Sequence, residues 1–157
     1  MQYPGYNTGN VHLEEGEWYP FKIHNLVQLQ DEANYYVLTD INGMKHFMPS
    51  GYYTDYGFKI GDEIICKIDR INCTGRIFLE PTHPFYKESE IYIFELESYL
   101  TQGKNITLFV KGIIGSCIEV PVSDIDISSL AMKKEVSCKV QNIKKGILIL
   151  EFYNICA

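Results

Sequence analysis

Residues 61–80, Gly-Asp-Glu-Ile-Ile-Cys-Lys-Ile-Asp-Arg-Ile-Asn-Cys-Thr-Gly-Arg-Ile-Phe-Leu-Glu, indicate most directly how the chain folds. The turn Gly61-Asp62 precedes an apolar, alternating stretch at 63–71, which is typical of a half-buried strand. The tight turn Cys73-Thr74-Gly75 then leads into a second short strand at 76–80. These residues therefore predict a β-hairpin.

Three further strands are expected upstream of this hairpin. Residues 18–27 alternate apolar and polar side chains, and residues 35–39 are rich in aromatic and β-branched types. The dipeptide Asn42-Gly43 is a strong hairpin signal and leads into a strand at 44–48. Four rings then fall within 51–58, and we expect at least two of them to plug the end of a small barrel, with Tyr52 or Tyr53 as the candidate for exposure.

The pattern recurs about 72 residues further along the chain. Phe21 matches Phe94 and Cys66 matches Cys138, and the two slips of one residue fall at expected loops. Five short strands in each repeat suit a small barrel of the OB type. We therefore predict an all-β chain of two tandem five-stranded OB-like barrels with little helix, the one undecided stretch being 123–134. The predicted bounds are an N-terminal arm at 1–13, a first barrel at 14–83, a linker at 84–89 and a second barrel at 90–157.

Composition narrows the class of protein. The 157 residues are 46% hydrophobic and 22% charged, which is ordinary for a globular domain and excludes wholesale disorder. The net charge is −6, and residues 1–86 carry −5 of it, so coating of nucleic acid by bulk electrostatics is not expected. Five cysteines without a CxxC pair predict free thiols and a cytoplasmic location. No secretory leader and no membrane-spanning segment are expected.

Motifs for catalysis or metal binding are not recognised in the sequence. The four histidines lack HxxxH or HExxH spacing, and no cysteine pairs with them at ligand spacing. Cys73 lies in a tight turn, where an inert thiol is a simpler reading than a nucleophile. We find no phosphate-binding glycine loop, no GxSxG and no paired aspartates for Mg²⁺. The prediction is a protein that is not an enzyme and that holds no cofactor and no metal.

Several stretches resemble the S-one-type RNA-binding OB domain, a family named after the largest protein of the small ribosomal subunit. They are Gly43-Met44-Lys45-His46, residues 60–68 beginning with Ile60-Gly61-Asp62, Ile71-Asn72, and Gly75-Arg76-Ile77-Phe78-Leu79. The resemblance covers residues 17–80, and over 90–151 it survives mainly at core positions. It implies an RNA-binding face on the first barrel.

The resemblance also implies particular binding residues. By position, Tyr36 matches a binding aromatic of the family, His46 its histidine and Arg76 its arginine. The chain departs from the family pattern elsewhere: its second aromatic falls near Ala33, its aspartate at Asn72 and its serine at Glu80. In the second repeat the histidine and arginine positions read Ile118 and Ile147, so that barrel is similar in fold but lacks the ligand set.

The residue types themselves are compatible with binding of single strands. Such binding needs flat rings for base stacking and a few cations for phosphates. Rings on adjacent strands lie side by side at every second residue, but alternation alone leaves open whether Tyr36 and Phe78 face the ligand or the core. The candidate nucleic-acid-binding residues are Tyr36, His46, Arg76, Phe78, Lys45 and Lys67, with Arg70 on the same rim.

Two functions follow as hypotheses. The first is a non-catalytic protein that binds RNA or single-stranded nucleic acid with modest affinity through the first barrel. The alternative is a protein-interaction or scaffold module that has lost nucleic-acid binding. The near-continuous apolar strand at 146–152 favours docking of the second barrel, through Ile147 and Ile149, on the first barrel, a second copy of the chain or a larger protein partner.

Overall fold

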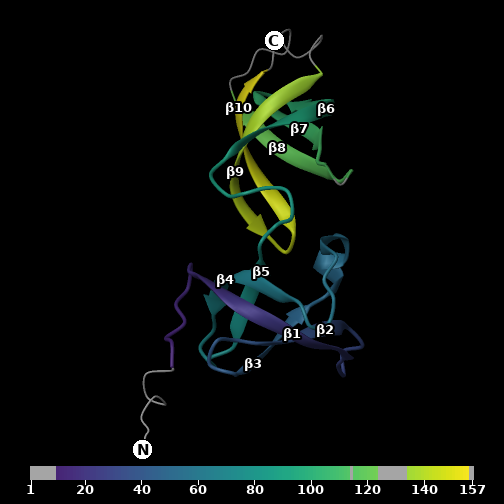
Figure 1. Ribbon diagram of the computed structural model, residues 1–157. Helices are drawn as coiled ribbons and strands as arrows, with labels where there is room; N and C mark the ends of the chain where they lie inside the picture. The colour runs from purple at the N-terminus through teal and green to yellow at the C-terminus, as the bar shows by residue number, and fades with distance from the viewer. Residues whose placement is uncertain (1–9, 114, 124–133, 156–157) are drawn as a thin grey trace, which may run out of the picture. The chain divides into compact units, whose positions relative to one another are not determined.

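The structure is a computed structural model that describes residues 10–113, 115–123 and 134–155 (Figure 1). The chain divides into two compact units, Met1–Thr82 (unit 1) and His83–Ala157 (unit 2). Each unit contains one five-stranded antiparallel sheet, and a single short 3₁₀ helix is the only helix among the described residues. The prediction of an all-β chain with little helix is confirmed. Most of the undecided stretch 123–134 lies outside the described residues.

The sheet of unit 1 has the strand order β3-β2-β1-β4-β5. Its strands are β1 (Trp18–Gln28), β2 (Asn34–Thr39), β3 (Lys45–Pro49), β4 (Glu63–Ile71) and β5 (Ile77–Pro81). Gly43 adopts a φ of 82° in the β2–β3 turn, a conformation that glycine reaches without a steric penalty. The edge strands β3 and β5 approach each other over only a short stretch.

The core of unit 1 lies inside this curved sheet. Phe21 and Ile23 of β1 pack against Leu38, Met48 and the strands opposite. The 3₁₀ helix η1 (Gly51–Tyr56) follows β3 and contributes a fully buried ring, Tyr53. Tyr56 and Phe58 pack against the same core, whereas Tyr52 is 47% exposed. The prediction that at least two rings of this segment pack inward is confirmed.

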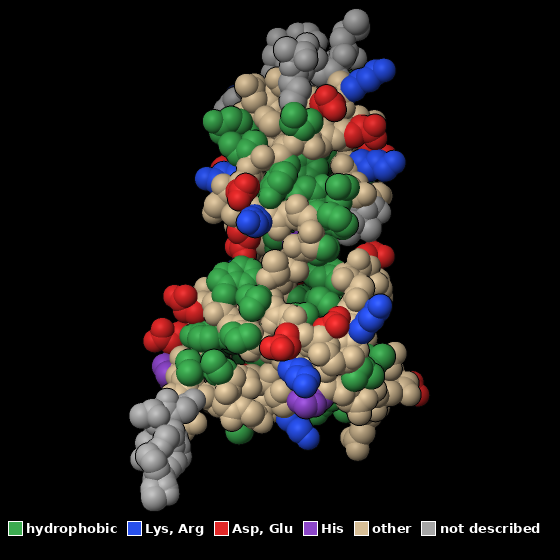
Figure 2. All heavy atoms as spheres, viewed as in Figure 1, with side chains coloured by type: hydrophobic (Ala, Val, Ile, Leu, Met, Phe, Trp, Pro, Cys, Tyr) green, Lys and Arg blue, Asp and Glu red, His purple; other side chains and the backbone are tan. Residues whose placement is uncertain are grey.

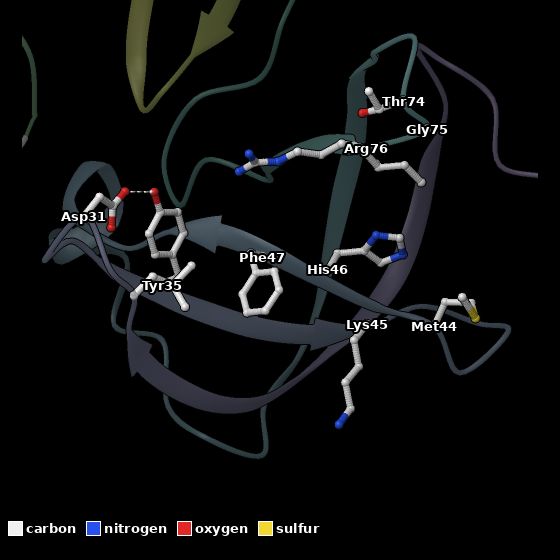
Figure 3. A pocket seen from close by; sticks show the side chains of 11 residues that line it. Asp31, Tyr35, Met44, Lys45, His46, Phe47, Thr74, Gly75 and Arg76 are labelled. Atoms are coloured by element: carbon white, nitrogen blue, oxygen red, sulfur yellow. Dashed lines mark hydrogen bonds between the residues drawn. The ribbon is translucent and has the colours of Figure 1, made fainter.

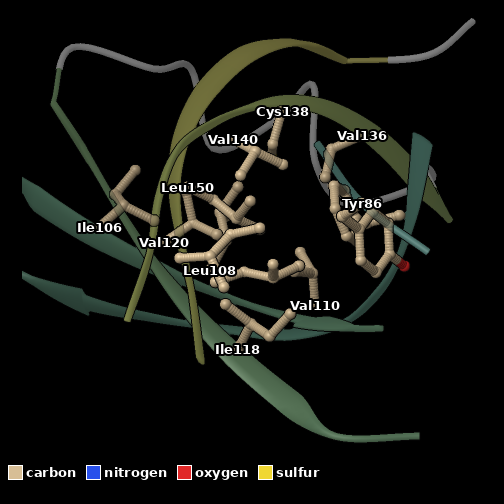
Figure 4. Close-up of a cluster of buried hydrophobic side chains, with 13 residues drawn as sticks. Tyr86, Ile106, Leu108, Val110, Ile118, Val120, Val136, Cys138, Val140 and Leu150 are labelled. Atoms are coloured by element: carbon tan, nitrogen blue, oxygen red, sulfur yellow. The ribbon is translucent and has the colours of Figure 1, made fainter. Parts of the chain in front are cut away.

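The sheet of unit 2 has the corresponding order, β10-β9-β6-β7-β8. Its strands are β6 (Ile91–Gln102), β7 (Asn105–Lys111), β8 (Cys117–Ser123), β9 (Glu135–Lys144) and β10 (Ile147–Ile155). The edge strands β8 and β10 lie side by side, so this sheet curls almost into a closed barrel. Its interior is filled by Phe94 and by valine, leucine and isoleucine side chains. Figure 4 shows these aliphatic side chains gathered inside the sheet, with Tyr86 at one side of the cluster.

Hydrogen bonds recur at the positions that the sequence repeat pairs. The Gly16 N–H donates to the Ile68 carbonyl at 2.8 Å, and the Ser89 N–H donates to the Val140 carbonyl at 2.7 Å. Tyrosine hydroxyls accept matched backbone amides as well, from Glu14 to Tyr19 at 3.0 Å and from Lys87 to Tyr92 at 2.8 Å. The two units therefore share strand order and local hydrogen bonding.

Three of the predictions concern the cysteine thiols, membrane-spanning helices and the apolar strand at 146–152. Cys66, Cys73 and Cys117 are free thiols, and Cys156 lies outside the described residues. Among the described residues, no helix is long and apolar enough to cross a membrane. Ile147 and Ile149 project to the surface of unit 2, where they are 64% and 44% exposed.

Candidate nucleic-acid interface

A pocket of about 560 Å³ opens on unit 1 beside the edge strand β3 (Figure 3). It is built by four segments: the β1–β2 turn, β2, β3 with the residue before it, and the β4–β5 turn with the start of β5. We call it the unit 1 pocket. It is lined by Leu29, Asp31, Tyr35, Met44, Lys45, His46, Phe47, Thr74, Gly75, Arg76 and Ile77.

Two aromatic rings form the floor of this pocket. Tyr35 and Phe47 lie on the paired strands β2 and β3, and their ring centroids are 6.4 Å apart at an interplanar angle of 86°. Phe47 is 41% exposed, so a large part of its ring is accessible in the pocket. An edge-to-face pair of this kind leaves one ring face open, and a planar ligand can stack on it.

An acidic group stands at the rim, in the β1–β2 turn. The Tyr35 hydroxyl donates to Asp31 Oδ2 at 2.7 Å, and the Ala33 N–H donates to Asp31 Oδ1 at 3.1 Å. These bonds, with a smaller contribution from the charge of Arg76, lower the pKa of Asp31. The same Tyr35–Asp31 bond raises the pKa of Tyr35. Asp31 is therefore a fixed, charged carboxylate at neutral pH.

His46 is hydrogen-bonded to the buried carboxylate of Asp40. Its Nε2 lies 2.7 Å from Asp40 Oδ2, and the two side chains are 13% and 2% exposed. Asp40 Oδ1 also accepts the N–H groups of Asn42 and Met44, at 2.8 and 2.9 Å. Burial alone would raise the pKa of Asp40, but the hydrogen bonds from His46 and the two amides outweigh it and lower the pKa. Because the carboxylate can only accept, Nε2 is the donor, and the imidazole orientation is fixed.

Cations reach the pocket from β3 and from the β4–β5 turn. Figure 3 shows the Arg76 side chain extending over the pocket toward Tyr35 and Asp31. The guanidinium carbon of Arg76 also lies 4.9 Å from the ring centroid of Phe78, and that of Arg70 lies 4.4 Å from it. Lys45 is exposed at the outer edge of the lining.

The structure brings together three of the six candidate residues, namely Lys45, His46 and Arg76. Phe78 does not line the pocket, and the guanidinium groups of Arg70 and Arg76 lie over its ring. Lys67 lies elsewhere, with its Nζ 5.8 Å from the ring centroid of Trp18 on β1. Tyr36 packs against the core with its ring 5.8 Å from that of Phe58, so the inward orientation considered in the sequence analysis is the one observed.

Sequence reasoning missed Asp31, Tyr35 and Phe47. Tyr35 alternates along β2 with Tyr36 and Leu38, which face the core, but the sequence alone did not show which of the two sets faces inward. Asp31 sits in a turn, where an aspartate is commonly explained by bonding to the backbone. Phe47 follows His46 directly, and its exposure was the signal that only the structure could supply.

Unit 2 lacks these groups at the matched positions. Gly112 takes the place of Asp40 and Ile118 the place of His46, in a turn with the same backbone hydrogen bonds. A Cβ atom on Gly112 would meet Ile118 Cδ1 at 3.3 Å, so the absence of a side chain at position 112 leaves room for the isoleucine. Unit 2 thus forms this corner without a hydrogen bond between a carboxylate and an imidazole.

Comparisons with known proteins do not identify a family. No protein-family model matches the chain, and no curated protein matches it significantly. Similar solved structures include a crystal structure of the tetrameric p202 HIN2, at 10% identity and a TM-score of 0.30, which covers 92% of this chain and 97% of that one. Another is described as "Structural mimicry for functional antagonism", at 10% identity and a TM-score of 0.31, covering 92% and 94%. A third is described as "Molecular basis for abrogation of activation of pro-inflammatory cytokines". Its identity is 10% and its TM-score 0.31, and the match covers 91% of this chain and 94% of that one. Likenesses this distant carry no argument about function.

Proposed function

We propose that the chain is a tandem of two OB-like barrels and that unit 1 binds single-stranded nucleic acid, RNA or DNA, without catalysis. The observation that carries the proposal is the position of the unit 1 pocket. OB barrels bind oligonucleotides on the face of strands 2 and 3, between the loops that join strands 1–2 and 4–5. Strands β2 and β3 and these two turns supply the lining of the pocket.

The side chains of the pocket suit this ligand. Phe47 and Tyr35 offer ring faces to bases, and each stacked base contributes about 1–3 kcal/mol. Arg76 and Lys45 offer positive charge to phosphates, and His46 offers a fixed imidazole edge. The resemblance to the S-one-type domain supports the same face through His46 and Arg76, and we propose affiliation with that family.

The proposed affinity is modest because the surroundings are acidic. Unit 1 holds Lys45 and Arg76 within an overall negative surface, and Figure 2 shows acidic and basic side chains interspersed on the visible face. Electrostatic attraction to phosphate falls with such a balance. Stacking rather than charge therefore supplies most of the proposed binding energy.

The test is fluorescence anisotropy of labelled single-stranded RNA and DNA 12-mers titrated with the full chain at low and moderate salt. Phe47→Ala should weaken binding by roughly 5- to 150-fold, the equivalent of one stacked base. Phe85→Ala removes a phenylalanine that is likewise exposed, 51%, but lies in unit 2, and it should leave the affinity unchanged. Absence of binding at low salt to every oligonucleotide would refute the proposal.

A protein-interaction role is the second candidate, favoured by the apolar surface of unit 2. Ile93, Ile147 and Tyr153 are each more than 60% exposed and add apolar surface to unit 2. Gel filtration of the wild type and of Ile149→Lys tests this role. A larger species that the variant abolishes would support it, and a monomer in both cases would remove the homodimer from consideration.

A further inference from the structure

Three polar groups of different character converge above the rings of the unit 1 pocket. The Asp31 carboxylate and the Tyr35 hydroxyl are joined by their 2.7 Å hydrogen bond. The Arg76 guanidinium extends toward them from the opposite side of the pocket, as Figure 3 shows. A site that recognised only phosphate would gain nothing from Asp31, because a carboxylate repels a phosphate. The pairing of an acceptor and a donor group indicates recognition of a base edge.

The number and kind of hydrogen bonds that these groups can form with a ligand are limited. A charged carboxylate only accepts, and its two oxygens offer about four lone-pair sites, of which Ala33 N–H and Tyr35 OH occupy two. A guanidinium only donates. The ligand edge that satisfies both must present two adjacent donors to Asp31 and an acceptor to Arg76.

Among the four bases, guanine alone has this arrangement. Its Watson–Crick edge carries the donors N1–H and N2–H₂ side by side with the acceptor O6 next to them, and the acceptor N7 follows on the Hoogsteen edge. Adenine presents one donor beside an acceptor nitrogen. Uracil presents a single donor between two carbonyl oxygens, which a carboxylate repels, and cytosine presents one amino donor with acceptors beyond it.

We propose that the unit 1 pocket selects guanine, with Asp31 as the specificity-determining residue and Tyr35 as the residue that positions it. The inference rests on the proposed function, since it assumes that the pocket takes a nucleobase. In this arrangement the base stacks on Phe47, donates from N1 and N2 to Asp31, and accepts at O6 or N7 from Arg76. The exposure of Asp31 leaves its remaining lone pairs accessible to such a ligand.

The experiment compares four labelled 12-mers with the full chain at one low salt concentration. Each is an oligouridylate, unmodified or carrying guanosine, inosine or adenosine at every third position, a spacing that avoids guanine quadruplexes. A bidentate pair discriminates by about 1–3 kcal/mol, so guanosine should bind roughly 5- to 150-fold more tightly than adenosine. Inosine, which lacks the N2 amino group, should fall between them.

Variants separate the carboxylate from the fold. Asp31→Asn keeps an oxygen for Ala33 N–H but replaces half of the acceptor by a donor, and it should reduce the preference for guanosine to within about twofold of unity. Asp55→Asn makes the same change of charge at an exposed aspartate that does not line the pocket, and it should keep the preference. Tyr35→Phe keeps the ring but frees Asp31, so its preference should lie between wild type and Asp31→Asn.

The outcomes are distinct. Guanosine preference that is lost in Asp31→Asn and kept in Asp55→Asn supports the inference. Binding of all four oligonucleotides with equal affinity, or a preference that survives in a folded Asp31→Asn variant, overturns the guanine inference and leaves the proposed function standing. No binding of any 12-mer overturns both.

Discussion

Replacing Asp40 and His46 by the residues that unit 2 has at the matched positions is the most informative change for unit 1. The pair is joined at 2.7 Å, and the Asp40 carboxylate is 2% exposed. His46→Ile leaves this buried carboxylate without its imidazole partner, and Asp40→Gly leaves the imidazole and the N–H groups of Asn42 and Met44 without their acceptor. For a buried pair that loss is 3–5 kcal/mol. In His46→Ile the carboxylate keeps its two amide donors, and in Asp40→Gly the remaining imidazole is partly exposed. We therefore expect each variant to lower the free energy of unfolding of unit 1 by about 2–4 kcal/mol.

The double variant should lose less free energy of unfolding than the two single variants together. Gly112 and Ile118 pack in contact at this corner of unit 2, and the glycine's own backbone penalty is about 0.5–1 kcal/mol. We therefore expect a coupling free energy of about 1–3 kcal/mol between the two positions, in the range measured for residues in contact.

Urea unfolding followed by tryptophan fluorescence measures this coupling. Trp18 is the only tryptophan of the chain and lies in β1, so its emission reports on unit 1. The double variant should fold and should bind oligonucleotide more weakly than wild type, which would separate the role of the pair in the site from any need of the fold. Single-variant costs that simply add in the double variant would refute the reasoning that this pair and the Gly112–Ile118 pair are interchangeable solutions.

Two other predictions concern titration and reactivity. His83 is buried, and its Nδ1 accepts the N–H groups of Phe85 and Tyr86 at 3.1 and 3.3 Å. Burial lowers the pKa of His83, so the unfolded chain takes up a proton near pH 6.5 before the folded chain does, and the stability of unit 2 should fall as pH drops below about 6.5, by at most about 1.4 kcal/mol per pH unit. Amide hydrogen exchange of peptides from 91–123 at pH 5 and pH 7 measures this, and an equal loss of protection in His83→Asn would contradict it. Burial also raises the pKa of Cys66, whereas Cys73 is exposed, so alkylation of the native chain mapped by mass spectrometry should modify Cys73 and spare Cys66; modification of both at similar rates would show that unit 1 opens readily.

Strands and turns followed from the sequence because their signals are local. The expected strand at 63–71 coincides with β4, and the Asn42-Gly43 hairpin has its glycine at a positive φ. Alternation over a few residues and one turn dipeptide suffice for such assignments.

The site followed only in part, since it depends on which way side chains face in a curled sheet. Lys45, His46 and Arg76 were within reach of sequence reasoning because β3 and the β4–β5 turn carry family-like motifs. Tyr36 was chosen over Tyr35 because it matched the family by position, but Tyr36 packs with Leu38 against the core and Tyr35 lines the pocket. The hydrogen bond between Asp40 and His46 joins the two sides of the β2–β3 turn, and neither composition nor spacing gave a signal for it.

The central claim is that nucleic acid binds to unit 1 at the face of β2 and β3. Ultraviolet cross-linking of a bound 12-mer, followed by digestion and mass spectrometry, tests it without any substitution. We predict cross-linked peptides that contain Tyr35 and Phe47, with the β4–β5 turn as the next site. Cross-links confined to peptides from 91–155, or none at protein concentrations well above micromolar, would contradict the account.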